Sequence, residues 1–252
     1  RTLFHCTNSY YIPNVSAAAY SCRTNLPPNT AFRGFGGPQG MFVIEAAIGH
    51  AAEALETDRA IIQRKNLLRD GDDFPYGQTA ESDAITTWEQ GNAKFDFGKL
   101  REEAENFNAR SRYLKRGIAF MPVCFGISFT KTPMNHASSL VHVYTDGSVA
   151  VSTGAVEMGQ GVNTKIAQVA AQVFSLPIER VRVQTANTLR IANTSPTAAS
   201  AAADLNGRAT QMACEAISSR LKEVAKSLVE ARSAHDITFQ NGFVMRNGDA
   251  TD

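Results

Sequence analysis

The chain has 252 residues, 43% of them hydrophobic, which is enough to bury one large core or two smaller ones. Lys and Arg number 25 against 24 Asp and Glu, so nucleic acid and anionic membranes are not expected as partners. The four cysteines lack CxxC spacing, which argues against a zinc site, an iron–sulfur cluster or a disulfide framework, and we expect no metal ligated by side chains. Without an apolar run of about 18 residues or a signal-peptide profile, we expect a globular, cytoplasmic protein.

Apolar periodicity and turn residues divide the first part of the chain into one strand, a loop and three helices. In chain order we expect a strand over 15–24, a helix from Pro38 to about 55, a helix capped by Thr57-Asp58 and ended by Asp70-Gly71, a loop over most of 72–88 and a helix over 98–110. Near Arg116-Gly117 the pattern changes to strand-like runs. We therefore place a domain boundary between residues 115 and 116.

Strands and helices alternate in the second part of the chain, without an internal repeat. We expect strands over 118–129 and 139–145, a turn at Asp146-Gly147 into a strand over 148–152, a helix over 164–174, a strand over 180–184, a helix from 205 to about 231 and a hairpin over 237–246. The alternation places the fold in the α/β class, as a mixed α+β arrangement. The chain also begins at Arg1 without Met, and we expect it to be a piece of a longer protein.

Three stretches carry candidate chemistry. Residues 31–39 (AFRGFGGPQ) relax the backbone with glycines just before a helix N-terminus, where unpaired amides favour an anionic ligand. Residues 156–162 (VEMGQGV) place Gln160 between glycines, and its carboxamide can both donate to and accept from the edge of a heterocycle. Residues 193–204 (NTSPTAASAAAD) are small and allow close backbone approach. Each stretch alone is also compatible with a tight packing loop or an ordinary helix start.

Together, in this order and spacing, the three stretches resemble the molybdenum-binding subunit or domain of the xanthine dehydrogenase and xanthine oxidase family. The resemblance runs from Arg1 to about Leu221, through Thr24–Pro27, Arg64–Asn66, Phe125–Thr130, His142–Ser148 and Ala203–Gly207. It implies that 1–115 is the C-terminal part of a first molybdopterin-binding domain. Residues 116–252 would then be the N-terminal part of a second such domain.

The resemblance also implies an enzyme that oxidises hypoxanthine and xanthine to urate by inserting water-derived oxygen at a ring carbon. Arg1 matches the family's substrate-binding arginine, whose charge offsets negative charge that develops on the purine. Phe35 and Phe129 match the two aromatic rings that sandwich the substrate, and Thr130 adjoins it. Residues matching contacts to molybdenum and its pterin are Arg33, Gly34, Phe35, Gly159, Gln160, Ala199 and Ser200. Considered alone, Arg1 would be a disordered terminal cation, and Phe35 and Phe129 would be core residues.

The family's two catalytic glutamates belong to stretches outside this chain, so we expect the chain alone to hold neither molybdopterin nor activity. We do not assign the role of base to Glu157, although it adjoins a glycine loop. Alanine at positions 202 and 203 leaves fewer hydroxyls than animal members have, which bears on individual pterin hydrogen bonds. Iron–sulfur clusters and FAD are expected on other domains or subunits of the parent enzyme, and the whole assembly is expected to be a dimer.

Two alternatives remain open. The chain could belong to an aldehyde oxidase or another N-heterocycle dehydrogenase of the same superfamily, although aldehyde oxidases usually lack an arginine at the position of Arg1. It could instead be a non-catalytic scaffold piece. A nucleotide-binding module is disfavoured because neither GxGxxG nor GxxxxGKS follows a strand in the required context.

Overall fold

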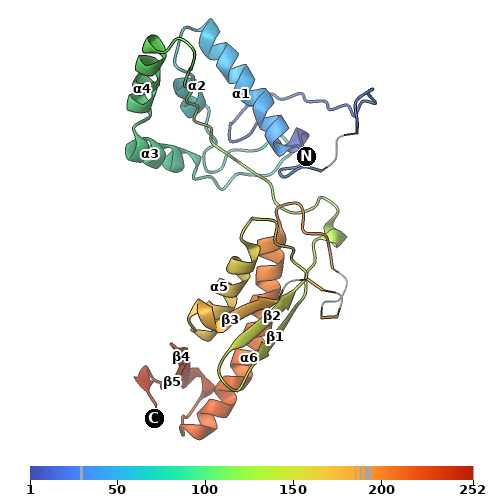
Figure 1. Cartoon of the computed structure of the whole chain (residues 1–252), viewed down its shortest axis with the longest axis vertical. Coiled ribbons are helices and arrows are strands. Elements are labelled where there is room, and N and C mark those ends of the chain that lie inside the picture. Colours follow the sequence, from blue (N-terminus) through green and yellow to red (C-terminus); the bar gives the residue numbers. More distant parts are fainter. Residues whose placement is uncertain (29–30, 185, 188, 191–193, 252) are drawn as a thin grey trace. The chain divides into compact units, whose positions relative to one another are not determined.

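Figure 1 shows the course of the chain in a computed structural model, which describes all residues except 29–30, 185, 188, 191–193 and 252. The chain forms two units, Arg1–Gly126 and Ile127–Asp252. The domain boundary that the sequence predicts between 115 and 116 stays a prediction. None of the described helices combines the length and the apolar character that crossing a bilayer requires.

Unit 1 is helical. Its elements are the 3-10 helix η1 (Leu3–His5) and the helices α1 (Gly37–Ala54), α2 (Arg59–Lys65), α3 (Ala84–Phe95) and α4 (Phe97–Arg110). The helices expected after Pro38, after Asp58 and over 98–110 are confirmed. Pro38 lies in the first turn of α1, and the Asp58 side chain caps α2 by accepting from the amide of Ala60 at 2.7 Å.

The core of unit 1 joins its helices to segments that are far apart in sequence. Its buried members are Tyr10, Ile48, Leu67 and Trp88. The sequence predicted that α2 continues through Leu67. Leu67 instead pairs with Tyr10 in an isolated antiparallel bridge. The helix therefore ends at Lys65 and not at Asp70-Gly71.

One further prediction for unit 1 is wrong. Residues 15–24 form no strand, since none of their backbone groups belongs to a ladder, and Tyr20 is 86% exposed. The loop predicted over most of 72–88 is confirmed for residues 72–83, whereas α3, which begins at Ala84, was not predicted. That helix is stabilised by tertiary packing, because Trp88 meets Phe97 edge to face with ring centroids 5.6 Å apart.

Residues 118–129 also form no strand, although their sequence is strand-like. Side chains of unit 1 satisfy the backbone of this segment in place of a neighbouring strand. Gln63 Nε2 donates to the carbonyl of Phe120 at 2.8 Å, and Asn8 Nδ2 donates to that of Pro122 at 2.7 Å. The amide of Cys124 in turn donates to Asn8 Oδ1 at 3.1 Å.

Unit 2 contains a mixed three-stranded sheet with the order β1-β2-β3. Its strands are β1 (Ser139–Val143), β2 (Val149–Thr153) and β3 (Val181–Gln184). The hairpin predicted at Asp146-Gly147 is confirmed, since β1 and β2 are antiparallel with Val141 opposite Val151. Helix α5 (Val162–Phe174) and the 3-10 helix η3 (Ile178–Arg180) return the chain so that β3 runs parallel to β2.

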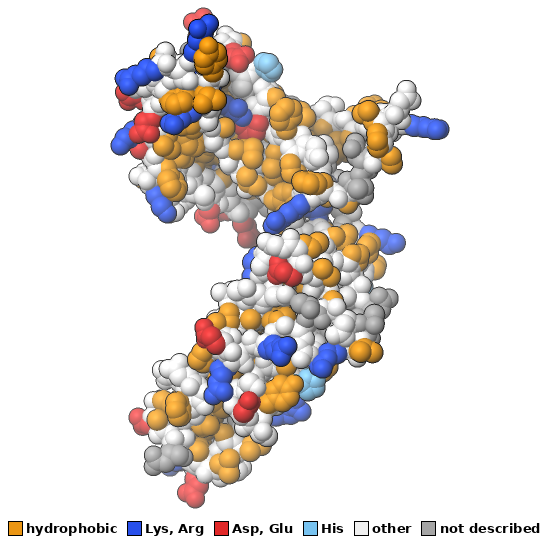
Figure 2. Space-filling view, viewed as in Figure 1, with side chains coloured by type: hydrophobic (Ala, Val, Ile, Leu, Met, Phe, Trp, Pro, Cys, Tyr) orange, Lys and Arg blue, Asp and Glu red, His pale blue; other side chains and the backbone are white. Residues whose placement is uncertain are grey.

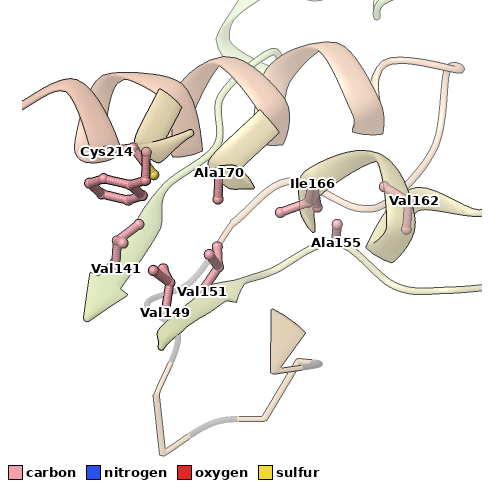
Figure 3. Close-up of a cluster of buried hydrophobic side chains, with 9 residues drawn as sticks. Val141, Val149, Val151, Ala155, Val162, Ile166, Ala170 and Cys214 are labelled. Carbon is pink, nitrogen blue, oxygen red and sulfur yellow. The ribbon is translucent and has the colours of Figure 1, made fainter. Parts of the chain in front are cut away.

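The hydrophobic core of unit 2 lies between this sheet, α5 and the long helix α6 (Ala202–Leu228), as Figure 3 shows in part. Val151, Ile166, Ala170 and Cys214 are all 0% exposed. Alanines on α5 allow close packing between the two helices. A Cβ on Gly207 of α6 would be 3.8 Å from Val169 of α5.

A small antiparallel sheet follows α6. After the 3-10 helix η4 (Ala234–Asp236), the strands of this sheet are β4 (Ile237–Gln240), β5 (Phe243–Arg246) and β6 (Asp249–Ala250). A further 3-10 helix, η2 (Thr132–Met134), precedes β1. The predicted hairpin is confirmed, with φ of 51° at Asn241 and 86° at Gly242 in its turn. The sequence did not predict β6. In Figure 2, acidic and basic side chains are interspersed on the visible face of each unit, as expected from the charge balance.

Candidate functional site

Arg1 is held in a defined place on unit 1 and is not a disordered cation. Its Nη1 donates to the carbonyl of Gly126 at 2.6 Å, and its Cζ lies 5.7 Å from the centroid of the Phe125 ring. The carbonyl of Arg1 is 2.8 Å from Nδ1 of His5. Both the main chain and the guanidinium of Arg1 are therefore fixed by hydrogen bonds.

The first glycine loop, residues 31–39, lies beside Arg1. An added Cβ on Gly36, whose φ is 92°, would be 2.8 Å from Oγ1 of Thr2 and 3.6 Å from Cβ of Arg1, and one on Gly37 would be 2.4 Å from the Phe125 ring. Only glycine can occupy such positions, so these residues let the start of α1 approach Arg1 and Phe125 closely. Within unit 1 the structure thus brings together Arg1 and the glycine loop.

Phe35 is not a core residue, since it is 61% exposed. Its φ is 45°, and the glycines on either side of it, Gly34 and Gly36, have φ of 93° and 92°. Left-handed backbone at a bulky aromatic residue is unfavourable by about 1–3 kcal/mol and is most often found at functional sites. Arg33 is also exposed in this loop.

In unit 2 the second glycine loop, residues 156–162, folds around its own polar side chains. The carboxylate of Glu157 accepts from the amides of Gly161 at 2.9 Å, Gly159 at 3.0 Å and Asn163 at 3.1 Å. These amides, that of Asn163 foremost, lower the pKa of Glu157 below its usual range. Gln160 donates to the carbonyl of Val156 at 2.8 Å and accepts from the amide of Met158 at 2.6 Å.

The second glycine loop contacts the stretch of small residues that the sequence places over 193–204. The amide of Val156 donates to Oγ1 of Thr197 at 2.9 Å. Two residues further, Ala199 and Ser200 have φ of 57° and 58°, again in the left-handed region. Asn193, which begins the predicted stretch, lies outside the described residues.

A third segment, which carries Phe129, meets the same stretch. The amide of Ser128 donates to the carbonyl of Ala199 at 2.9 Å. Asn135 fixes Phe129 on both sides, since its Oδ1 accepts from the amide of Phe129 and its Nδ2 donates to the carbonyl, each at 2.8 Å. Phe129 is half-buried, and the next residue, Thr130, is exposed.

The three segments of unit 2 converge where α5 and α6 begin. Gly161 and Ala201 directly precede these helices. The N-cap residue of α6, Ala201, has no side-chain acceptor, so among the described residues no side chain caps the first backbone amides of α6, and such amides can bind an anion. The structure therefore brings together five unit 2 residues predicted from the sequence, Phe129, Gly159, Gln160, Ala199 and Ser200, while Arg1, Arg33, Gly34 and Phe35 belong to unit 1.

Two buried amide oxygens lie near the starts of these helices, one in the first turn of α5 and one in the second turn of α6. Oδ1 of Asn163 in α5 and Oδ1 of Asn206 in α6 are buried with no hydrogen-bond partner among the residues that the structure describes. A buried carbonyl oxygen without a donor is unfavourable. Both atoms could accept from the N–H groups of a polar heterocycle.

Across the described part of the chain, no three His, Cys, Asp or Glu side chains gather as metal ligands. A cavity of about 850 Å³ in unit 1 has Trp88 and Phe120 in its wall, but no site residue predicted from the sequence lines it.

Sequence reasoning missed two residues that organise these segments, His5 and Asn135. Neither stands in a recognisable motif, because each acts through hydrogen bonds to backbone groups. His5 bonds across more than a hundred positions, and Asn135 follows a turn containing Pro133. The spacing of polar residues in the sequence gave no signal for either.

Comparisons with known proteins give matches in both parts of the chain. Two family models, each described as a molybdopterin cofactor-binding domain, match residues 1–67 and 90–251. The chain is 46% identical over 226 residues to xanthine dehydrogenase 1 of Arabidopsis thaliana, and 45% identical over 225 residues to a nicotinate hydroxylase of Emericella nidulans. The alignments cover 89% and 88% of this chain but only 17% of each relative, so the chain spans about a sixth of their length.

A solved structure agrees with this match. Quinoline 2-oxidoreductase from Pseudomonas putida 86 aligns with a TM-score of 0.72 and 26% sequence identity, over 86% of this chain and 29% of that one.

Proposed function

Because this chain belongs to the molybdopterin cofactor-binding domain family, we propose that it forms part of the cofactor and substrate site of a molybdenum hydroxylase that oxidises hypoxanthine and xanthine to urate. The observation that carries the proposal is the convergence of three segments of unit 2 at the starts of α5 and α6. Iron–sulfur clusters and FAD would lie on other domains or subunits of a cytoplasmic, dimeric parent enzyme.

The residues at the starts of α5 and α6 fit a molybdopterin chemically. The cofactor carries an anionic phosphate, which suits the uncapped amides of α6. Its pterin ring has N–H donors, which suit the partnerless Oδ1 atoms of Asn163 and Asn206. A Cβ on Gly159 or Gly161 would meet no atom within 4 Å, so the loop has open space beside it.

The bound molybdenum centre would supply the oxidation of an electron-poor ring carbon with oxygen from water. We assign to the residues of this chain the tasks of binding and orienting. Gly159, Gln160, Ala199 and Ser200, with Arg33, Gly34 and Phe35, are proposed to contact the cofactor.

Arg1 is proposed to bind the purine and to offset the negative charge that it acquires during oxidation. Phe35 and Phe129 would contact the flat faces of the ring, and Thr130 would hydrogen-bond to its edge. The hydrogen bond from Arg1 Nη1 to Gly126 supports this role, because fixing one nitrogen of a planar guanidinium sets the direction of the others.

A second candidate function is the hydroxylation of another N-heterocycle. The similarity to a nicotinate hydroxylase, at 45% identity, supports it. Replacing Arg1→Met in the complete enzyme tests the assignment of Arg1. A purine hydroxylase loses xanthine turnover far more than aldehyde turnover, whereas equal losses count against the assignment of Arg1.

The cofactor proposal is tested by Ser200→Asp in the complete enzyme. Ser200 is exposed, and Ala201 alone separates it from the first residue of α6. A carboxylate there stabilises the helix N-terminus by about 0.3–1 kcal/mol, but it repels an anionic phosphate bound to the same amides. We therefore expect an unchanged or raised unfolding temperature, with molybdenum and pterin per polypeptide reduced on the order of tenfold or more.

Ser219→Asp provides the matched control, because Ser219 is an exposed serine in the C-terminal half of α6. This variant adds the same charge far from the start of the helix and is expected to keep its cofactor. Full molybdenum content in Ser200→Asp, or an equal loss in both variants, would contradict the proposed cofactor site.

A further inference from the structure

His5 closes a ring of hydrogen bonds between Arg1 and Gly126. Its Nδ1 lies 2.8 Å from the carbonyl oxygen of Arg1, and its Nε2 accepts from the amide of Gly126 at 3.0 Å. The ring closes through the guanidinium of Arg1, which donates to the carbonyl of Gly126 at 2.6 Å. One imidazole thus connects the main chains of two residues that are 125 positions apart.

The partners of His5 specify which ring nitrogen donates and which accepts. A backbone amide can only donate, so Nε2 must be without a proton, and a carbonyl oxygen can only accept, so Nδ1 must carry one. The two hydrogen bonds therefore favour one tautomer, with the proton on Nδ1. His5 is only 4% exposed, so water cannot readily replace either partner.

Packing fixes the position of this imidazole. Its centroid lies 4.7 Å from that of Phe125, the same ring that the Arg1 guanidinium faces. The backbone of His5 is pressed against α1, since a Cβ on Gly40 would be 3.1 Å from the carbonyl carbon of His5. His5 consequently has little freedom to move away from Arg1.

We propose that His5 is a positioning residue for Arg1, which aims the guanidinium by holding its main chain and its acceptor, Gly126, in one frame. The proposal rests on the substrate-binding role proposed for Arg1. Because His5 does not itself touch the substrate, the proposal predicts that His5 contributes to turnover only through Arg1.

The test is a double-mutant cycle in the complete enzyme, with rates expressed per bound molybdenum. His5→Phe keeps an aromatic ring against Phe125 but removes both hydrogen bonds, and we expect it to lower kcat/KM for xanthine on the order of tenfold. His5→Gln can restore one of the two bonds, and its loss should be smaller. In an Arg1→Met background, His5→Phe should change kcat/KM less than about twofold, because the group that it positions is gone.

A different result in the cycle overturns the proposal. If His5→Phe has no effect in the parent background, or lowers kcat/KM by the same factor with and without Arg1, His5 is a structural residue only. An unfolding temperature measured for each variant identifies loss of folding, in which case His5→Gln completes the cycle. Failure of the proposed function is distinguishable, because Arg1→Met alone would then leave xanthine turnover unchanged.

Discussion

Removal of the Glu45 carboxylate should destabilise unit 1 strongly. Glu45 projects from α1, is 5% exposed and accepts four hydrogen bonds. The donors are Arg59 Nη2 at 2.5 Å, Tyr10 Oη at 2.6 Å, Gln63 Nε2 at 2.9 Å and Asn8 Nδ2 at 3.3 Å. Burial foremost, and then Glu45, raise the pKa of Tyr10, which keeps its hydroxyl protonated as a donor.

The size of the effect follows from the groups that Glu45→Ala leaves behind. Breaking a buried ion pair costs about 3–5 kcal/mol, but the Arg59 side chain is 37% exposed and can be partly solvated. The hydroxyl of Tyr10, which is 1% exposed, has no such relief. We therefore expect the free energy of unfolding to fall by about 3 kcal/mol.

Trp88 makes this measurement specific, because it is the single tryptophan of the chain and lies in the core of unit 1. Urea unfolding followed by its fluorescence reports on this unit. Glu53→Ala is the control, since Glu53 lies on the same helix with its side chain 81% exposed, and should change stability by less than about 0.5 kcal/mol. A loss below about 1 kcal/mol in Glu45→Ala, or equal losses in both variants, would refute the reasoning.

Two predictions concern pH. Burial, and then Glu215, raise the pKa of the Cys214 thiol to about 11. The stabilisation from burying the neutral thiol is therefore complete below the ordinary thiol pKa and is lost as pH rises towards 11. Iodoacetamide should label exposed Cys22 in the folded chain at pH 8.5 but Cys214 only after unfolding, and equal labelling rates would be inconsistent with this burial. The pKa of Glu157 is lowered, so its contribution to stability changes with pH in the opposite direction. Its bonds to the loop amides stabilise the loop above the ordinary glutamate pKa of about 4.3 and are lost as pH falls through the lower folded-state value. A carboxyl-carbon NMR titration of Glu157 should have its midpoint below 4.3, and a midpoint at or above 4.3 would exclude these bonds.

The parts of the fold that local signals specify were predicted from the sequence. Pro38 marked the start of α1, Asp58 the start of α2, and Asp146-Gly147 the β1–β2 hairpin. In each case the residue that specifies the element lies within it or next to it. The two hairpins and the long helices therefore needed no knowledge of distant contacts.

Residues 118–129 and helix α3 were not predicted correctly because their structure depends on distant partners. Residues 118–129 are strand-like in sequence, but side chains such as Gln63 and Asn8 take the place of a neighbouring strand. Helix α3 depends on the contact between Trp88 and Phe97. For the candidate site, the motifs identified the glycine loops, but His5 and the interactions of Glu157 became visible only in three dimensions.

The central claim is that the segments at the starts of α5 and α6 contact a molybdopterin. Hydrogen–deuterium exchange of the complete enzyme, prepared with and without its cofactor, tests this directly. Amides in 156–164 and 197–206 should exchange more slowly when the cofactor is bound, while those of the β4–β5 hairpin, which serves as an internal reference, should be unchanged. Equal exchange of both loop segments in the two preparations would contradict the account.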